Sequence, residues 1–163
     1  MPLIGKTTQV LAYDISELKN RFIKYDLTRL LKGKSMLLTL KTNVQGDKVS
    51  TSPKRIMLMP YFLKRAVRKG TNYVEDSFSA ECKDEKIRIK PFLVTRRKVS
   101  RAVRKALREK AKEELLAYIK DKPLEQIFDD LIKNQLQKSL SLKLKKIYPL
   151  STCEIRVLEI EKR

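Results

Sequence analysis

Hydrophobic and polar residues alternate along Lys86–Thr95, and the spacing then changes to that of a helix. Ile87 and Ile89 alternate with basic neighbours before an apolar run, which predicts a strand. From Arg96 to Lys112, helical steps of about 100° place on one stripe Val99, Ala102, Val103, Ala106 and Leu107. The opposite side carries Lys98, Arg101, Arg104, Lys105, Arg108 and Lys112. The pattern therefore predicts a strand that runs directly into a helix with one face for a core and one for a polyanion.

Similar alternation predicts further strands along the chain. They are expected at Lys6–Ile15, Arg21–Leu27, Ser35–Thr42, Lys48–Ser52, Asn72–Cys82 and Thr152–Ile160. Gln45-Gly46-Asp47 would supply a hairpin turn, and Ser50–Pro53 is expected to form a short loop. Pro91 cannot donate to a ladder, so the strand that contains it should have an edge, a bulge or a bend there.

Helices are expected in three further segments. Pro60 can begin a helix that runs to Lys69 and stops at Gly70, Pro123 can begin another, and Gln135–Ile147 is amphipathic. Strands precede and follow the helices, which is typical of an α+β fold. We expect one domain over residues 1–163, with a small, mostly antiparallel β-barrel-like core and three to four helices packed outside. A last strand that returns after the helices would close such a barrel.

The charge of the chain narrows its possible partners. Its 38 basic and 19 acidic residues give a net charge of +19, which favours an anionic partner: nucleic acid first, an anionic membrane surface second. No apolar run is long enough for a transmembrane helix, and the N-terminus does not resemble a secretory signal. With no histidine and only Cys82 and Cys153, a structural zinc site is excluded and two reduced, buried thiols are expected.

Catalytic chemistry is not indicated. The acidic residues between Glu113 and Asp130 are expected on solvated helix faces or in protein contacts, because no nucleophile, base and orienting group occur together. Gly5-Lys6-Thr7 resembles the end of a phosphate-binding loop, but the glycine that should precede it is missing. We therefore expect no enzyme activity, cofactor, metal or small-molecule substrate.

The candidate functional residues are basic. Their side chains would contact phosphates of a nucleic acid and release the counterions bound there. Beside the helix face, a second patch occurs in 54–69, and Arg96-Arg97 lies where strand turns to helix. The full candidate set is Lys6, Lys54, Arg55, Lys64, Arg65, Arg68, Lys69, Arg96, Arg97, Lys98, Arg101, Arg104, Lys105, Arg108 and Lys112. Each patch could instead be an ordinary solvated face, and Tyr61 and Phe62 are expected in the core rather than under bases. Lys143, Lys145 and Lys146 form a weaker third cluster.

Four stretches in a fixed order resemble one known family. They are Leu3-Ile4-Gly5-Lys6-Thr7, Ile87-Arg88-Ile89-Lys90-Pro91 with Thr95, the helix through Ala106-Leu107-Arg108-Glu109, and Lys146-Ile147-Tyr148-Pro149-Leu150 with Glu154-Ile155-Arg156. The chain is similar in these to the archaeal and eukaryotic small-subunit ribosomal protein family called S-three-A-e, or eukaryotic-type S-one. Family members usually carry a longer lysine-rich N-terminal segment before the Leu-Ile-Gly stretch.

The resemblance implies a structural constituent of the small ribosomal subunit in the cytoplasm, of archaeal type. It implies a site on the platform near the messenger exit, with ribosomal RNA, including its 3′ region, as ligand and other platform proteins as neighbours. The alternative is a free RNA-binding regulatory or accessory protein that does not stay on ribosomes. A membrane-surface protein would need an exposed apolar stripe beside the basic face. The apolar residues of this chain are instead needed for the core, which disfavours that class of protein.

Overall fold

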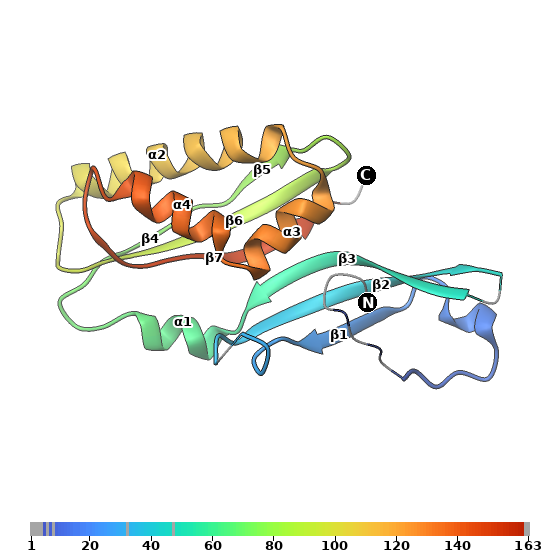
Figure 1. Ribbon diagram of the computed structural model, residues 1–163. Coiled ribbons are helices and arrows are strands. Elements are labelled where there is room, and N and C mark those ends of the chain that lie inside the picture. Colours follow the sequence, from blue (N-terminus) through green and yellow to red (C-terminus); the bar gives the residue numbers. More distant parts are fainter. Residues whose placement is uncertain (1–4, 6, 8, 32, 47, 162–163) are drawn as a thin grey trace.

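The protein is described by a computed structural model that covers residues 5, 7, 9–31, 33–46 and 48–161. Its centre is an antiparallel sheet in the order β1-β2-β3-β7-β6-β4, with β5 also paired to β6 (Figure 1). The strands are β1 (Phe22–Asp26), β2 (Met36–Gln45), β3 (Lys48–Leu58), β4 (Tyr73–Glu75), β5 (Phe78–Glu81), β6 (Lys86–Thr95) and β7 (Leu150–Ile160). The helices are η1 (Ile15–Leu18, 3-10), α1 (Pro60–Ala66), α2 (Arg101–Lys120), α3 (Leu124–Ile132) and α4 (Gln135–Leu144).

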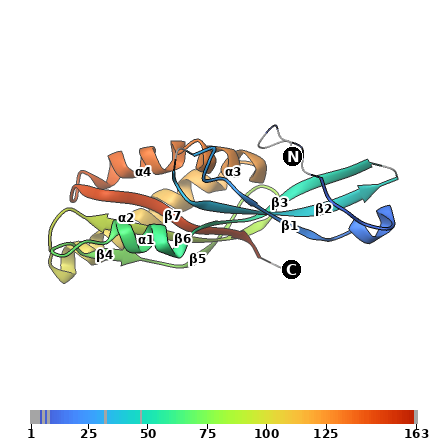
Figure 2. The same cartoon turned by 90° about the horizontal axis from the view of Figure 1, so that it is seen from below.

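The helices form two unequal layers on the sheet. α2, α3 and α4 cover one face, whereas the short α1 lies on the opposite face near β4, β6 and β7 (Figures 1 and 2). The larger core is enclosed between the three helices and the sheet, with Leu107, Phe128 and Leu158 almost fully buried. The β2–β3 hairpin extends beyond the helices as an arm, with η1 beside it.

The expected α+β class is confirmed, but the sheet is open and barrel-like only in a loose sense. β7 does not join the two outer strands; it lies in the middle, between β3 and β6. The last strand therefore connects two halves of one sheet instead of closing a barrel. β7 is irregular and covered on both sides, because its register shifts against β6 and helices lie on both faces of the sheet there.

Both prolines within the sheet lie at irregularities. The register of β6 against β7 shifts between Lys90 and Pro91, which is the bulge that Pro91 predicted. The prediction of a loop at Ser50–Pro53 was wrong, because β3 continues through these residues. Pro53 is tolerated there since the pairing of β2 with β3 shifts between Thr39 and Leu40, where the ladder lacks regular bonds.

Two other strand predictions need correction. The strand predicted at Lys6–Ile15 does not form in the described residues of that segment, where Leu11 and Tyr13 are 95% and 100% exposed. Alternation alone failed there because no strand of the described structure pairs with this segment or covers its apolar side chains. The strand predicted at Asn72–Cys82 is divided into β4 and β5, which both pair with β6.

The helix after β6 begins later than the basic run. Ser100 is the N-cap of α2, with its hydroxyl accepting from the Val103 N–H at 3.4 Å, so Arg96–Lys98 lie in the loop before the helix. The buried stripe of α2 consists of every fourth residue: Leu107, Ala111, Leu115 and Ile119. The predicted stripe was thus partly wrong, since Ala102 is exposed.

A half-buried polar cluster connects α2 with α3. The carboxylate of Asp130 accepts a hydrogen bond from the Tyr118 hydroxyl at 2.7 Å and from the Lys122 ammonium at 2.6 Å. Burial raises the pKa of Asp130, but the hydrogen bonds from Lys122 and Tyr118 outweigh it and hold the pKa below its usual 3.8. The ionised carboxylate therefore stabilises the packing of the two helices.

We expect Asp130→Asn to lower the free energy of unfolding at pH 7 by about 1.5–3 kcal/mol, because it leaves the hydrogen-bonded ammonium without its charged acceptor. The folded-state pKa of Asp130 lies below the unfolded value, so this contribution is present above pH 4 and is lost as the pH falls through the folded-state pKa. Urea unfolding at pH 7 and pH 2.5 measures both effects. Asp121→Asn, at an exposed residue, is the control; equal losses in both variants would contradict the prediction.

The two cysteines are both free and partly buried. Burial raises the pKa of the Cys153 thiol to about 12, with a further contribution from Glu154. We expect a Cys82→Ser variant to resist iodoacetamide at pH 8 while folded and to react fully in denaturant, since only thiolate is nucleophilic. Mass spectrometry measures the alkylated fraction. Rapid alkylation of folded protein with an unchanged unfolding midpoint would show that Cys153 is accessible.

Candidate nucleic-acid interface

Two basic segments that are distant in the sequence meet at one end of the sheet. The turn after α1 leads into β4, and the end of β6 leads into α2. Asn72 and Thr95 join them: the Thr95 N–H donates to the Asn72 carbonyl at 2.9 Å, and the Asn72 N–H donates to the Thr95 hydroxyl at 3.0 Å. The segment after α1 and the loop before α2 therefore lie side by side (Figures 1 and 2).

The same two residues fix the loop before α2. The side-chain oxygen of Asn72 accepts from the Val99 N–H at 2.9 Å, and the Thr95 hydroxyl lies 2.7 Å from the Arg97 carbonyl, to which it can donate. Thr95 is fully buried. Backbone groups within the Arg96–Lys98 segment, at Arg97, and directly after it, at Val99, are thus held by buried or half-buried partners. This limits the backbone positions from which the three basic side chains extend.

We call this part of the molecule the basic end; it is at the left of Figure 1. Its residues are Lys64, Arg65, Arg68, Lys69, Arg96, Arg97, Lys98 and Arg101, all of them exposed. The sequence has no acidic residue between Lys48 and Val74 or between Lys86 and Arg108. Within the described residues, no ion pair involves a member of the basic end. The structure thus assembles cations without their own counter-charges.

The start of α2 adds to this field. Unsatisfied N–H groups give a helix N-terminus partial positive charge, so acidic residues are favoured in the first turn and basic ones disfavoured. α2 has no acidic residue in its first turn and begins with Arg101. Arg104 follows one turn later. This arrangement disfavours the isolated helix and favours an external anion, which would interact with the cations and the helix terminus together.

The other predicted residues of α2 extend from the basic end with differing surroundings. Arg108 and Lys112 are exposed, and the Lys112 ammonium lies 5.9 Å from the centre of the Phe78 ring. Lys105 pairs with Glu109 at 3.8 Å, although both side chains are mostly exposed. Arg104 is half-buried, and its buried Nε has no hydrogen-bond partner in the described structure.

Lys54 and Arg55 lie away from the basic end, on β3. Arg55 Nε is 3.4 Å from Glu159 of β7, which is a contact within the sheet. Lys54 lines an opening near the start of β6, whereas the basic end is at the other end of that strand. Ten residues at about 3.3 Å each separate the two ends of β6 by roughly 30 Å. Lys6 lies outside the described residues.

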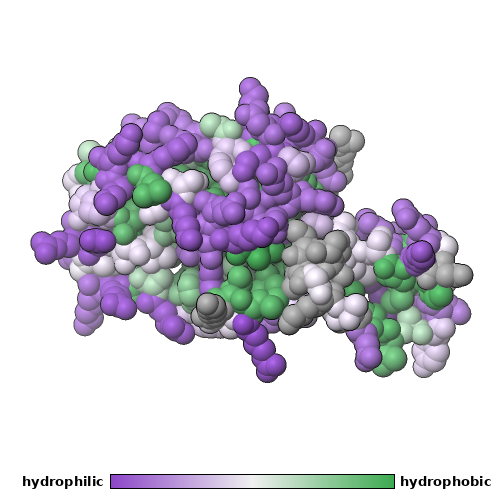
Figure 3. Space-filling model, viewed as in Figure 1, coloured by the Kyte–Doolittle hydropathy of each residue, from purple (hydrophilic) through white to green (hydrophobic). Residues whose placement is uncertain are grey.

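Carboxylates elsewhere are mostly matched with cations of the chain. Glu113 and Glu114 pair with Lys110, and Glu114 also pairs with Lys143, so the second half of α2 is nearly neutralised. Asp129 of α3 pairs with Lys133, the residue after that helix. The acidic residues of 113–130 therefore lie on solvated faces and in ion pairs, as expected. Figure 3 shows hydrophilic side chains spread over the helical layer in this view, and hydrophobic ones mainly below it and in the arm.

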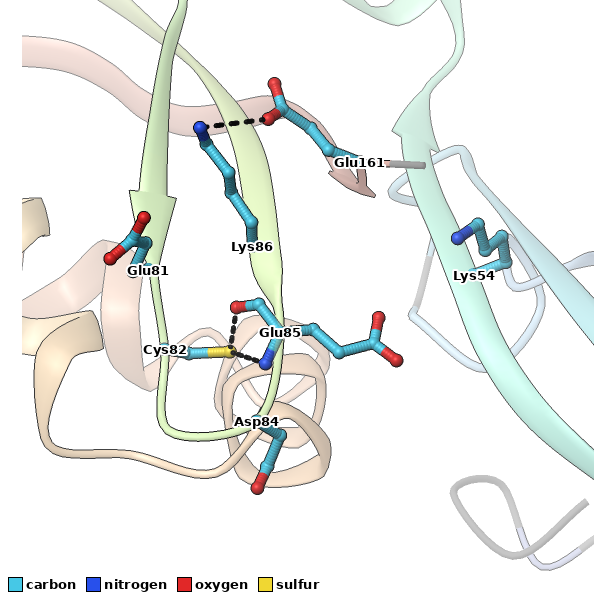
Figure 4. A pocket seen from close by; sticks show the side chains of 7 residues that line it. All are labelled: Lys54, Glu81, Cys82, Asp84, Glu85, Lys86 and Glu161. Carbon is cyan, nitrogen blue, oxygen red and sulfur yellow. Dashed lines mark hydrogen bonds and ion pairs between the residues drawn. The ribbon is translucent and has the colours of Figure 1, made fainter. Parts of the chain in front are cut away.

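The opening near the start of β6 is the acidic counterpart of the basic end. It has a volume of about 780 Å³ and is lined by Lys54, Glu81, Cys82, Asp84, Glu85, Lys86 and Glu161 (Figure 4). The Cys82 sulfur accepts from the Glu85 N–H at 3.3 Å, and Lys86 lies 3.9 Å from Glu161. The carboxylates point in different directions, and no group of three potential metal ligands occurs within the described residues. Excess negative charge here would repel a phosphate.

Comparison with known proteins identifies the family. The sequence profile described as the Ribosomal S3Ae family matches residues 3–163. The chain belongs to this family. It is similar to the small ribosomal subunit protein eS1 of Halorubrum lacusprofundi, with 31% identity over 77% of this chain and 60% of the relative. The proteins of the same name from Haloarcula marismortui and Nanoarchaeum equitans are 29% and 27% identical, over 85% and 75% of this chain and 66% and 62% of theirs.

The chain thus matches about three fifths to two thirds of the length of these relatives. The resemblance to the S3Ae family seen in the sequence is confirmed, and the archaeal relatives agree with it. None of the described helices is long and apolar enough to cross a bilayer.

The supporting role of Asn72 was missed in the sequence. In the S3Ae resemblance Thr95 was noticed, but nothing indicated that its partner would be a residue before β4. Asn72 follows Gly70 and Thr71 in a segment that reads only as a turn, where asparagine is common for local reasons. Only the pairing of β4 with β6 brings the two side chains together.

We expect Asn72→Ala to accelerate amide hydrogen exchange at Val99 by about 5- to 100-fold, because the Val99 N–H loses its acceptor. Hydrogen exchange measured by NMR at pH 7 gives the rate for each amide. Asn72→Asp retains an acceptor oxygen at the same place and is the matched control. If both variants leave the Val99 rate unchanged, Asn72 does not hold the loop.

Proposed function

We propose that this S3Ae-family chain is a non-catalytic, structural constituent of the small ribosomal subunit in the cytoplasm, and that it binds ribosomal RNA through the basic end and the adjoining face of α2. The observation that carries the proposal is the group of exposed cations at the basic end, none of which has an ion-pair partner among the described residues. The relatives' name, small ribosomal subunit protein eS1, supports the ribosomal assignment. We further propose the site that the resemblance implied: the platform near the messenger exit, beside the 3′ region of the RNA and other platform proteins.

The mechanism combines neutralisation of phosphates by exposed cations with a loop whose backbone is already fixed. Lysine and arginine side chains neutralise phosphates and release condensed counterions, which gives affinity that falls steeply with salt but reads little sequence. Arginines at the loop can also clamp a phosphate through two N–H groups. Because Asn72 and Thr95 fix the loop, less conformational entropy is lost on binding. The protein then acts as a rigid cationic support for folded RNA.

Lys54, Arg55 and Lys6 are weaker parts of the proposed interface. Arg55 already contacts Glu159, and Lys54 lines the acidic opening, so neither is adjacent to the basic end. Lys6 enters the proposal on its charge alone. The proposal therefore places the first phosphate contacts at the loop before α2, the turn after α1 and the exposed residues Arg101, Arg108 and Lys112.

We expect the variant Arg97→Gln, Arg101→Gln, Arg108→Gln to bind an RNA fragment from the 3′ region of the small-subunit RNA more weakly and with a smaller salt dependence. Each lost phosphate contact should reduce the slope of log K against log salt by about 0.7–0.9. Filter binding over a KCl series measures the slope, and sedimentation with reconstituted subunits measures incorporation.

The matched control is Lys86→Gln, Lys90→Gln, Lys133→Gln, which removes the same charge from lysines that already contact carboxylates. Its slope should remain near that of the wild type. Equal slopes for the two triple variants would show that net charge, and not the basic end, controls binding. A free RNA-binding regulatory protein would instead separate from ribosomes on a gradient at moderate salt, whereas a ribosomal constituent would co-sediment.

A further inference from the structure

An apolar groove lies between α1 and the sheet, directly beside the basic end. One wall is formed by Pro60, Leu63 and Lys64 of α1, at helical spacing, and by Val67 directly after the helix. Tyr73, Glu75, Phe92 and Arg156 form the opposite wall, from β4, β6 and β7. Its volume of about 420 Å³ is within the range of roughly 300–1,000 Å³ that holds small organic groups. The groove is therefore large enough for one planar ring system with its substituents.

Tyr73 gives the groove a stacking surface. Its ring lies 6.2 Å from that of Phe92 between centres, and the two planes differ by 26°. Phe92 is only 2% exposed, whereas Tyr73 is 54% exposed. A buried ring thus supports an accessible one, which fixes the orientation of Tyr73 while much of its surface remains available. Such a supported aromatic side chain loses little entropy when another ring stacks on it.

The charges around the groove suggest what that ring carries. Lys64 is part of its wall, and Arg65 and Arg68 follow it in and after α1. The carboxylate of Glu75 is 3.0 Å from the Arg156 guanidinium, so the acidic member of the wall is already neutralised. An occupant with an apolar, planar part and an attached negative charge would match both the groove and its surroundings.

We infer that this groove holds one unpaired nucleobase of the RNA strand whose phosphates contact the basic end. The inference rests on the proposed RNA-binding function and deepens it. Single-stranded bases stack on aromatic side chains in many RNA-binding proteins, because every base has a π-face. An apolar side chain of a neighbouring protein could also enter the groove, but it brings no phosphate to the adjoining cations.

The test compares two single-stranded RNAs of about ten nucleotides, a length within the usual range of single-strand sites. They have the same number of phosphates, and one is abasic at its central positions. Fluorescence anisotropy measures binding to wild-type protein and to Tyr73→Ala, Tyr73→Phe and Tyr61→Ala. Tyr61 is an exposed tyrosine of α1 that does not line the groove, so its variant is the matched control.

We expect Tyr73→Ala to bind the base-containing strand about 5- to 100-fold more weakly than wild type. Tyr73→Phe, which keeps the ring, and Tyr61→Ala should bind it as wild type does. All four proteins should bind the abasic strand equally, because the phosphates are unchanged. Tyr73→Leu, which keeps an apolar contact with Phe92, should behave as Tyr73→Ala does and shows that lost folding is not the cause.

Three outcomes would overturn the inference. Unchanged affinity of Tyr73→Ala would show that no base uses the groove. An equal loss on both strands would show an indirect effect on the cations. Lost incorporation into reconstituted subunits with unchanged RNA affinity would indicate a protein side chain as the occupant. In each case the proposed RNA-binding function is tested independently, by the slope of log K against log salt for the variant with Arg97, Arg101 and Arg108 replaced by Gln.

Discussion

The pairing of β7 with both β3 and β6 is the interaction on which the rest of the structure depends. Within the described residues, β1, β2 and β3 form one half of the sheet and β4, β5 and β6 the other, and β7 alone bridges them. β7 also provides Leu158 and Ile155 to the core beneath the helices. The last strand of the chain must therefore be in place before the two halves share one core, which makes the fold rich in contacts between distant residues.

β7 also carries carboxylates that form ion pairs within the sheet. Glu154 pairs with Lys34, and Glu159 lies near both Arg55 and Lys90. Each such contact contributes little to stability when it is exposed, but together they keep carboxylates in the middle of the sheet. The basic end is consequently left with one sign of charge. Segregation of this kind produces a field that attracts an anionic partner from a distance, and it follows from topology as much as from composition.

The sequence predicted local structure well where a segment with a clear hydrophobic pattern also has a neighbouring strand to pair with. The strand Lys86–Thr95 has the predicted bounds, and the bulge at Pro91 follows from a missing N–H. The strand predicted before Ile15 was wrong because alternation alone does not show whether a partner strand is present, and none of the described strands pairs with this segment. The candidate cations were found from charge alone. Their division into a basic end and the separate pair Lys54 and Arg55 required knowledge of which strands are neighbours, and the sequence does not contain that directly.

A cluster of like charges destabilises the part of the fold that carries it, so the basic end must be held against its own repulsion. Asn72 and Thr95 do this with hydrogen bonds that fix the loop. RNA would relieve the same repulsion, and any ligand that binds only the folded state adds to its stability. The hydrogen bonds that order the loop would thus also preorganise it for the proposed polyphosphate partner. The Tyr73 ring beside it is supported by the buried Phe92 ring, 6.2 Å away between centres, so the proposed base contact would adjoin the proposed phosphate contacts on one preorganised surface.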